Sequence, residues 1–256
     1  MSPDESLESA SDDQAVAELL RALRDPDSAA ARLTFVTALR DVLVNIEDWI
    51  AIDSWIGGGK ITESRSHPDP STLSAFRGVA AVICMSAELT DAAVAMTEAR
   101  RYYAVGATLR QLIECEYLLV LFGQDFDQAR RWFESTPEQA RRAFTPSGMR
   151  KLTGFANHEY WEHCSTGGHP APKGIRLLEK MDPRRRVWPI AAAEVQMDLG
   201  LHLHRIWSAS DRLLAQHHAR YEAVRASQRQ QAQVAWETWL AADPAAAAFV
   251  SAWDDA

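Results

Sequence analysis

The chain has 256 residues, of which 47% are hydrophobic and 24% charged, the balance of an ordinary globular protein. Its formal net charge of −8 argues against broad, nonspecific binding to nucleic acid, because phosphate backbones are held by clustered lysine and arginine. The acidic, polar residues 1–12 are expected to form a disordered tail.

Helical patterns begin directly after this tail. The first covers residues 13–24 and ends at Asp25-Pro26, and the second runs from Ser28 to Ile56 and ends at three consecutive glycines. The apolar spacing then predicts two antiparallel helices over residues 72–97 and 101–122. Several alanines along the first of these would allow close helix packing.

Shorter helices are predicted next, over residues 125–135 and 136–144, because each begins with acidic residues and contains an arginine pair further on. The tripeptide Thr136-Pro137-Glu138 is a good N-terminal signature for the second. A short helix over 175–181 follows. From Pro189 one long helical pattern continues to Ala242 and ends before Asp243-Pro244.

No alternating apolar pattern bounded by turns is present, so strands are not expected. The predicted fold is all-α: a single helical domain over residues 13–243, built as one multi-helix bundle with a long C-terminal helix. A short C-terminal tail is expected over 244–256. We expect the long helix to provide the surface through which the protein forms a homodimer or binds a partner.

The cysteines and the N-terminus predict where the protein is located. Cys84, Cys115 and Cys164 are widely spaced and include no CxxC pair, which is typical of a reducing compartment. The N-terminal residues are the opposite of a signal or transit peptide. The longest apolar runs are too short to span a bilayer. The expected location is therefore cytoplasmic, with no membrane partner.

The stretch "EYWEHCSTGGHPAPKG" at 159–174 gathers reactive side chains, and a metal site is the first interpretation. His158 and Glu162 are four residues apart, with His163 and Cys164 beside them, and all four types are competent zinc ligands. No HExxH, CxxC or repeated Glu-x-x-His motif supports this. The spacing therefore assigns no metal, although a facing helix could add Glu194, Asp198 and His202.

Nucleophilic catalysis is the second interpretation of the same stretch. Cys164 and Ser165 lie near two histidines, but no strand, sharp turn and helix surround them as a nucleophile would require. Two glycines after Thr166 are also typical of a plain helix end. A ribonuclease-type spacing at Arg212 and His217 is equally weak, because a chain rich in arginine produces such matches by chance.

Arg110 and Glu114 stand four residues apart in the strongly apolar stretch "RYYAVGATLRQLIECEYLLVLFG". Burying a charge is costly unless it is paired. The pair is therefore either a salt bridge that keeps the bundle in register, or the charged floor of a pocket. In the second case the rim of the pocket would be formed by Tyr160, Ser165 and His169.

The segments "GATLRQLIECEYLL", "FDQARRWFES" and "EYWEHCSTGGHP", in this order, resemble the HEPN-like superfamily, specifically a bacterial all-helical group of unknown function with R-x-x-x-E and Y-x-x-x-S-x-x-x-H segments. The resemblance covers roughly residues 75–180. It implies a helical fold with a polar pocket between the Arg-Glu helix and the Ser-His turn. The polar positions fall on Arg110, Glu114, Tyr160, Ser165 and His169, with Ser165 one residue later than in the pattern.

Relatives in this superfamily act in phage defence, toxin–antitoxin pairs and RNA cleavage, or bind nucleotides. The resemblance thus implies a phosphate-bearing ligand, RNA or nucleotide. No cofactor is expected. In the stronger form the protein is a metal-independent ribonuclease, in which Arg110 neutralises phosphate, His169 is the general acid or base and Glu114 orients Arg110. Two alternatives stay open: a noncatalytic helical interaction protein, and a metal-dependent small-molecule enzyme using His158, Glu162 and His163.

Overall fold

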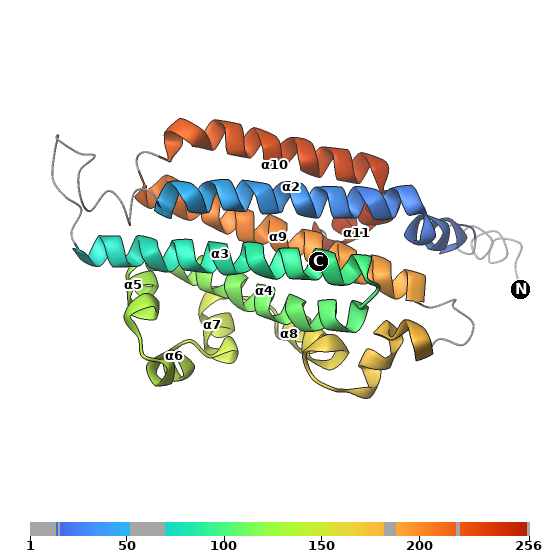
Figure 1. Ribbon diagram of the computed structural model, residues 1–256, viewed down its shortest axis with the longest axis horizontal. Coiled ribbons are helices and arrows are strands. Elements are labelled where there is room, and N and C mark those ends of the chain that lie inside the picture. The colour runs from blue at the N-terminus through green and yellow to red at the C-terminus, as the bar shows by residue number, and fades with distance from the viewer. Residues whose placement is uncertain (1–13, 15, 52–69, 182–187, 219–220, 255–256) are drawn as a thin grey trace, which may run out of the picture.

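The computed structural model describes residues 14, 16–51, 70–181, 188–218 and 221–254, and the secondary structure of these residues is helical, with no strand among them. The predicted all-α multi-helix bundle is confirmed. Its centre is a ring of four long helices, in which each packs against at least two others: α2 (Pro26–Ala51), α3 (Pro70–Glu98), α4 (Tyr102–Gln124) and α9 (Trp188–His217) (Figure 1). Apolar residues at helical spacing fill the interior of this ring: Val36, Leu39, Leu43, Val79, Ile83, Leu109, Ile113, Leu199, Leu203 and Ile206.

The two helices predicted over 72–97 and 101–122 are present as α3 and α4, within two residues at each end. By length and composition alone α3 would also be able to cross a membrane. However, 44% of its most apolar window is buried inside the bundle, and the core helix of a soluble protein meets the same criteria. This observation is therefore only weak evidence for a membrane.

Four short helices follow α4 on the side of the bundle away from α2: α5 (Asp127–Glu134), α6 (Pro137–Ala143), α7 (Pro146–Thr153) and α8 (Asn157–His163) (Figure 1). Of these, α5 packs mainly against α3, whereas α7 and α8 pack against α4. The N-terminal signature at Thr136 is confirmed, because its side chain and that of Gln139 form a reciprocal capping box. One π turn, η2 (Cys164–Gly168), and two 3-10 turns, η3 (Pro172–Leu177) and η4 (Glu179–Met181), follow. These short elements bring polar side chains back onto α4.

The long helical pattern from Pro189 to Ala242 is corrected by the structure. The chain reverses after α9, and a separate helix α10 (Glu222–Ala242) packs against α2 on the outside of the ring (Figure 1). No glycine or proline marks this reversal in the sequence. It is fixed by tertiary contacts instead: His217 stacks on Phe126 at 4.3 Å, and Arg225 donates to Asp211 at 3.0 Å.

The C-terminal residues are also corrected. Residues 244–254, expected as part of a tail, form α11 (Pro244–Asp254), and Ala245 and Ala246 are buried. Proline is well suited to the first position of a helix, so Asp243-Pro244 ends one helix and begins the next. The predicted tail over residues 1–12 lies outside the described residues.

Candidate functional site

The structure brings Arg110, Glu114, Tyr160 and His169 together, although they come from separate parts of the chain. Arg110 and Glu114 are one turn apart on α4, with Nε and Oε1 separated by 3.4 Å. The hydroxyl of Tyr160, from α8, accepts a hydrogen bond from Arg110 Nε at 3.2 Å and donates one to Glu114 Oε1 at 3.1 Å. The tyrosine hydroxyl therefore fixes one edge of the guanidinium.

The turn after α8 supplies a second set of contacts to Arg110. Its Nη1 lies 3.5 Å from the carbonyl oxygen of Gly168 and 3.3 Å from Nε2 of His169. A guanidinium only donates, so His169 accepts through Nε2 and carries its proton on Nδ1 when this bond forms. Among the described residues, Arg110 Nη2 makes no hydrogen bond. We call Arg110, Glu114, Tyr160 and His169 the arginine cluster.

Two glycines allow this turn to approach α4. A Cβ on Gly167 would lie 2.5 Å from the backbone of Gly106, and one on Gly168 would lie 2.8 Å from Cδ of Arg110. The turn is a π turn, closed by a 3.0 Å hydrogen bond from the N–H of His169 to the carbonyl of Cys164. π turns are rare and often found at functional sites. The two glycines thus do more than end α8: Gly167 permits direct backbone contact with α4, and Gly168 leaves room for the side chain of Arg110.

Ser165 does not join the arginine cluster. Its hydroxyl donates to the backbone carbonyl of Glu162 at 2.9 Å, and the hydroxyl of Thr166 donates to the same carbonyl at 2.8 Å. Serine and threonine in helical segments often bond to a carbonyl three or four residues earlier. The structure therefore gives Ser165 a local backbone contact in place of the expected position at the pocket rim.

The side chains considered as metal ligands point to different partners. His158 is exposed, Glu162 forms ion pairs with Lys173 and Arg176, and His163 faces α9. Lys173, the larger influence, holds the pKa of Glu162 below its usual range. In the described part of the chain, no group of three or more histidine, cysteine or acidic side chains is arranged to hold a metal ion. The geometry gives the metal hypothesis no support.

A buried polar network, which the sequence did not reveal as a unit, lies on the other side of α8. His202 Nδ1 is 2.8 Å from Glu116, and His202 Nε2 is 3.4 Å from Nε2 of His163. Arg205 donates to Glu159 at 2.6 Å and lies 3.6 Å from Glu116. The network joins α4, α8 and α9. Because Tyr160 lies between Glu159 and His163 on α8, the network also holds Tyr160 against α4.

Burial keeps most of this network uncharged. Glu116 is 1% exposed, and desolvation raises its pKa to about 8. Desolvation likewise lowers the pKa of His202 and of His163 to about 4. The sequence signal was available in part, since Glu116 lies in the same apolar stretch as Arg110. Its partners could not be found from that stretch, because they lie on other helices.

These pKa values predict a loss of stability in acid. His163, His202 and His204 have folded-state pKa values of about 4, well below the ordinary value. Between about pH 6.5 and pH 4 the unfolded chain therefore binds protons that the folded chain does not, so the free energy of unfolding falls as pH falls. Glu116 and Asp198, whose pKa values burial raises to about 8 and about 7, act in the opposite direction, but the three histidines outnumber them.

The His204→Phe variant tests the contribution of one histidine to this loss of stability. His204 stacks on Trp236 at 4.2 Å, and phenylalanine keeps an aromatic ring there but cannot be protonated. We expect about 1–3 kcal/mol less destabilisation between pH 7 and pH 4 than in the wild type. Urea denaturation across this range measures it. If the free energy of unfolding changed with pH in the same way in both proteins, the lowered pKa of His204 would be contradicted.

A surface pocket of about 830 Å³ opens between α3 and α4, and Arg110 is part of its wall. Apolar side chains form one part of the lining: Met85, Leu89, Ala92, Ala107, Cys115 and Leu118. Polar groups form the rest: Glu88, Arg110, Gln111, Glu114 and Gly168. The arginine cluster therefore stands at the edge of a pocket with an amphipathic lining.

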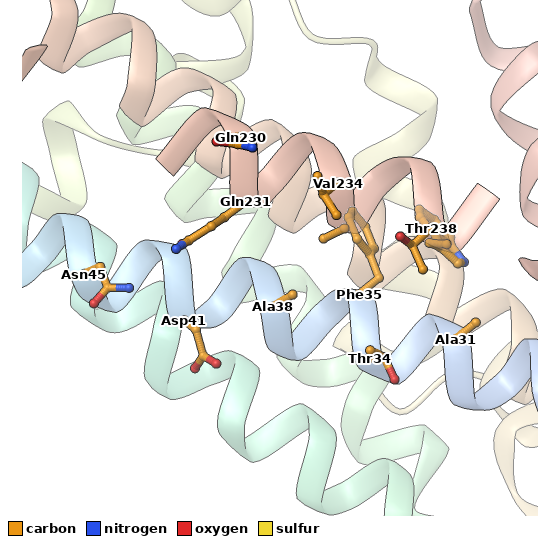
Figure 2. Close-up of a pocket in the computed structure, with 12 residues that line it drawn as sticks. Ala31, Thr34, Phe35, Ala38, Asp41, Asn45, Gln230, Gln231, Val234 and Thr238 are labelled. Carbon is orange, nitrogen blue, oxygen red and sulfur yellow. The ribbon is translucent and has the colours of Figure 1, made fainter. Parts of the chain in front are cut away.

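A second pocket, of about 820 Å³, lies between α2 and α10 (Figure 2). Phe35 and Trp239, which stack at 4.5 Å, lie at its floor, and Val234 beside them is 54% exposed. Asp41, Asn45 and Gln231 lie towards one end of it. Among the residues that the structure describes, its lining contains no arginine, lysine or histidine, so no cationic side chain there would pair with a phosphate.

Comparison of the chain with models of protein families, with curated proteins and with solved structures gave no match. The arginine cluster and the pocket beside it are therefore the features that point to a function.

Proposed function

We propose that this chain is a HEPN-like helical protein that binds a phosphate-bearing ligand, RNA or a nucleotide, at the arginine cluster. The observation that carries the proposal is the state of Arg110. Its side chain is 29% exposed at the edge of a pocket, and Glu114, Tyr160 and Gly168 hold it in one orientation. An oriented guanidinium with a remaining N–H edge is the group that proteins use to bind phosphate through paired hydrogen bonds.

The exposed imidazole of His169 stands beside this guanidinium, and it supports the stronger form of the proposal, metal-independent RNA cleavage. Arg110 would neutralise a phosphate oxygen, and His169 would transfer the proton of the attacking or leaving hydroxyl. Glu114 and Tyr160 would act as positioning residues, because their hydrogen bonds keep the guanidinium directed at the ligand. We infer a setting in defence or in a toxin–antitoxin pair from the resemblance alone.

Binding is tested by titration calorimetry with a short single-stranded RNA. The Arg110→Gln variant should weaken binding about 10- to 100-fold, because it removes charge-assisted hydrogen bonds worth about 1.5–3 kcal/mol. Arg142→Gln is the matched control: Arg142 is 80% exposed and pairs with Glu138 at 2.6 Å on α6, away from the arginine cluster. Equal affinities of the Arg110 and Arg142 variants would contradict the proposal.

Cleavage is tested separately, with the same RNA, in the presence of a chelator. If the protein is a ribonuclease, His169→Ala should lower the rate about 10²- to 10⁴-fold while RNA affinity changes little, because the histidine transfers a proton in the transition state. The folded state of each variant is checked by thermal unfolding. Variants of Arg110 and His169 that lose only thermal stability, with unchanged binding and cleavage, would favour the noncatalytic interaction protein instead.

A further inference from the structure

The lining of the pocket between α3 and α4 carries both signs of charge. Arg110 offers a cationic edge, whereas Glu114 lies 3.4 Å from it and the exposed Glu88 lines the same pocket. A bare anion attracted by the guanidinium is repelled by both carboxylates. A ligand with an anion at one end and N–H donors elsewhere would match both parts of the wall.

The apolar part of the lining favours a ligand with an organic half as well. Cys115 and Leu118 are buried and Leu89 is partly buried, so they provide an apolar floor. The small side chains of Ala92 and Ala107 leave space above it, and the pocket volume of about 830 Å³ lies in the range of small-molecule sites. Removing a flat apolar group from water would add affinity that the polar wall does not supply.

We propose that this pocket binds the base of a nucleoside phosphate whose phosphate lies on Arg110. The inference rests on the proposed phosphate binding and deepens it. The base packs over Leu118 and Leu89, and Glu88 and Gln111 accept and donate hydrogen bonds at its edge. The ligand is recognised as one base with one phosphate, whether it is a free nucleotide or the terminal nucleotide of an RNA strand.

The test uses titration calorimetry with three probes: adenosine 5′-monophosphate, ribose 5-phosphate and inorganic phosphate. Ala92 lies in the pocket lining on the exposed side of α3, so Ala92→Leu fills the pocket without disturbing the core. We expect it to weaken adenosine 5′-monophosphate about tenfold or more and to leave ribose 5-phosphate unchanged. Ala95→Leu is the control, because Ala95 is exposed on the same helix and does not line the pocket.

The Glu88→Ala variant tests the contact to the base edge. It should weaken adenosine 5′-monophosphate, whereas ribose 5-phosphate and inorganic phosphate should bind as tightly as before or more tightly, because a carboxylate that repels them is removed. The inference is overturned if the wild type binds adenosine 5′-monophosphate no more tightly than ribose 5-phosphate, or if Ala92→Leu changes neither. The proposed binding of phosphate at Arg110 would then still stand, without a site for the base. If none of the probes binds, the proposed function fails together with the inference.

The source of the ligand is decided by a further probe, a pentaadenylate carrying a 5′-phosphate. Affinity about tenfold above that of the monophosphate, lost in Ala92→Leu, identifies the end of an RNA strand as the ligand. Affinity equal to or below that of the monophosphate identifies a free nucleotide. Pentaadenylate binding that is strong but unaffected by Ala92→Leu would overturn the inference, because the strand would then be held outside the pocket.

Discussion

Replacing Arg32 with methionine should lower the free energy of unfolding by about 3–5 kcal/mol. The side chains of Arg32 and Asp243 are 1% and 0% exposed, and they form a two-pronged ion pair with distances of 2.6 and 3.0 Å. Trp239 donates to the same carboxylate at 3.2 Å. Methionine fills most of the space but leaves Asp243 as a buried carboxylate without its cation, and this uncompensated charge is the cause of the loss.

The Arg32→Met/Asp243→Asn double variant is the control for this expectation. It removes both charges, so it should recover a large part of the stability lost in the single variant. Urea denaturation followed by circular dichroism measures all three proteins. A single variant that loses less than about 1 kcal/mol, the range of an exposed pair, would show that the pair is not buried in solution.

Replacing Gly167 with valine should both destabilise the protein and remove ligand binding. Its Cβ would lie 2.5 to 2.9 Å from backbone atoms of Gly106 and Ala107 on α4. A backbone cannot yield as the end of a flexible side chain can, so the π turn must move away from α4. We expect a loss of about 1–3 kcal/mol, the usual cost of overpacking. Moving the turn also separates Gly168 and His169 from Arg110.

Gly123 provides a matched control on α4 itself. A Cβ at this position meets no atom within 4 Å, so Gly123→Ala should leave the free energy of unfolding unchanged or raise it by up to about 1 kcal/mol. Binding of the RNA used above should be kept. A Gly167→Val protein that is as stable as Gly123→Ala and binds the RNA as tightly would show that the turn does not touch α4.

The helical ring of the fold could be predicted from the sequence, because its helices carry apolar residues at the helical period and end at recognisable residues. The boundary between α9 and α10 could not be predicted, because the residues between His217 and Glu222 include no glycine or proline. The ion pair of Arg32 could not be predicted from the sequence either. Its partner Asp243 is 211 residues away and looked like the end of the domain.

The arginine cluster could be predicted in part. Arg110 and Glu114 stood out as charges in an apolar stretch, and the resemblance to a family linked them to Tyr160 and His169. Ser165 could not be placed in the same way. A π turn holds more residues than an α turn, so a helical wheel drawn through this turn gives the wrong direction for its side chains. The role of the glycine pair became clear only from the contact between Gly167 and Gly106.

The buried network of Glu116, Glu159, His163, His202 and Arg205 connects the fold to the arginine cluster. It holds α8 between α4 and α9, and α8 carries Tyr160, the residue that fixes the edge of Arg110. The histidine and cysteine that first suggest a reactive centre in this stretch, His163 and Cys164, are therefore directed into the protein, while His169 faces the solvent.

The binding proposed at Arg110 has two parts: the oriented guanidinium receives the phosphate, and the base of the ligand lies between α3 and α4. A crystal structure of the protein with adenosine 5′-monophosphate tests it most directly. We predict the phosphate within hydrogen-bond distance of Arg110, and the base over Leu118 between Glu88 and Gln111. A nucleotide bound elsewhere, with the Arg110–Glu114–Tyr160 contacts unchanged, would contradict it.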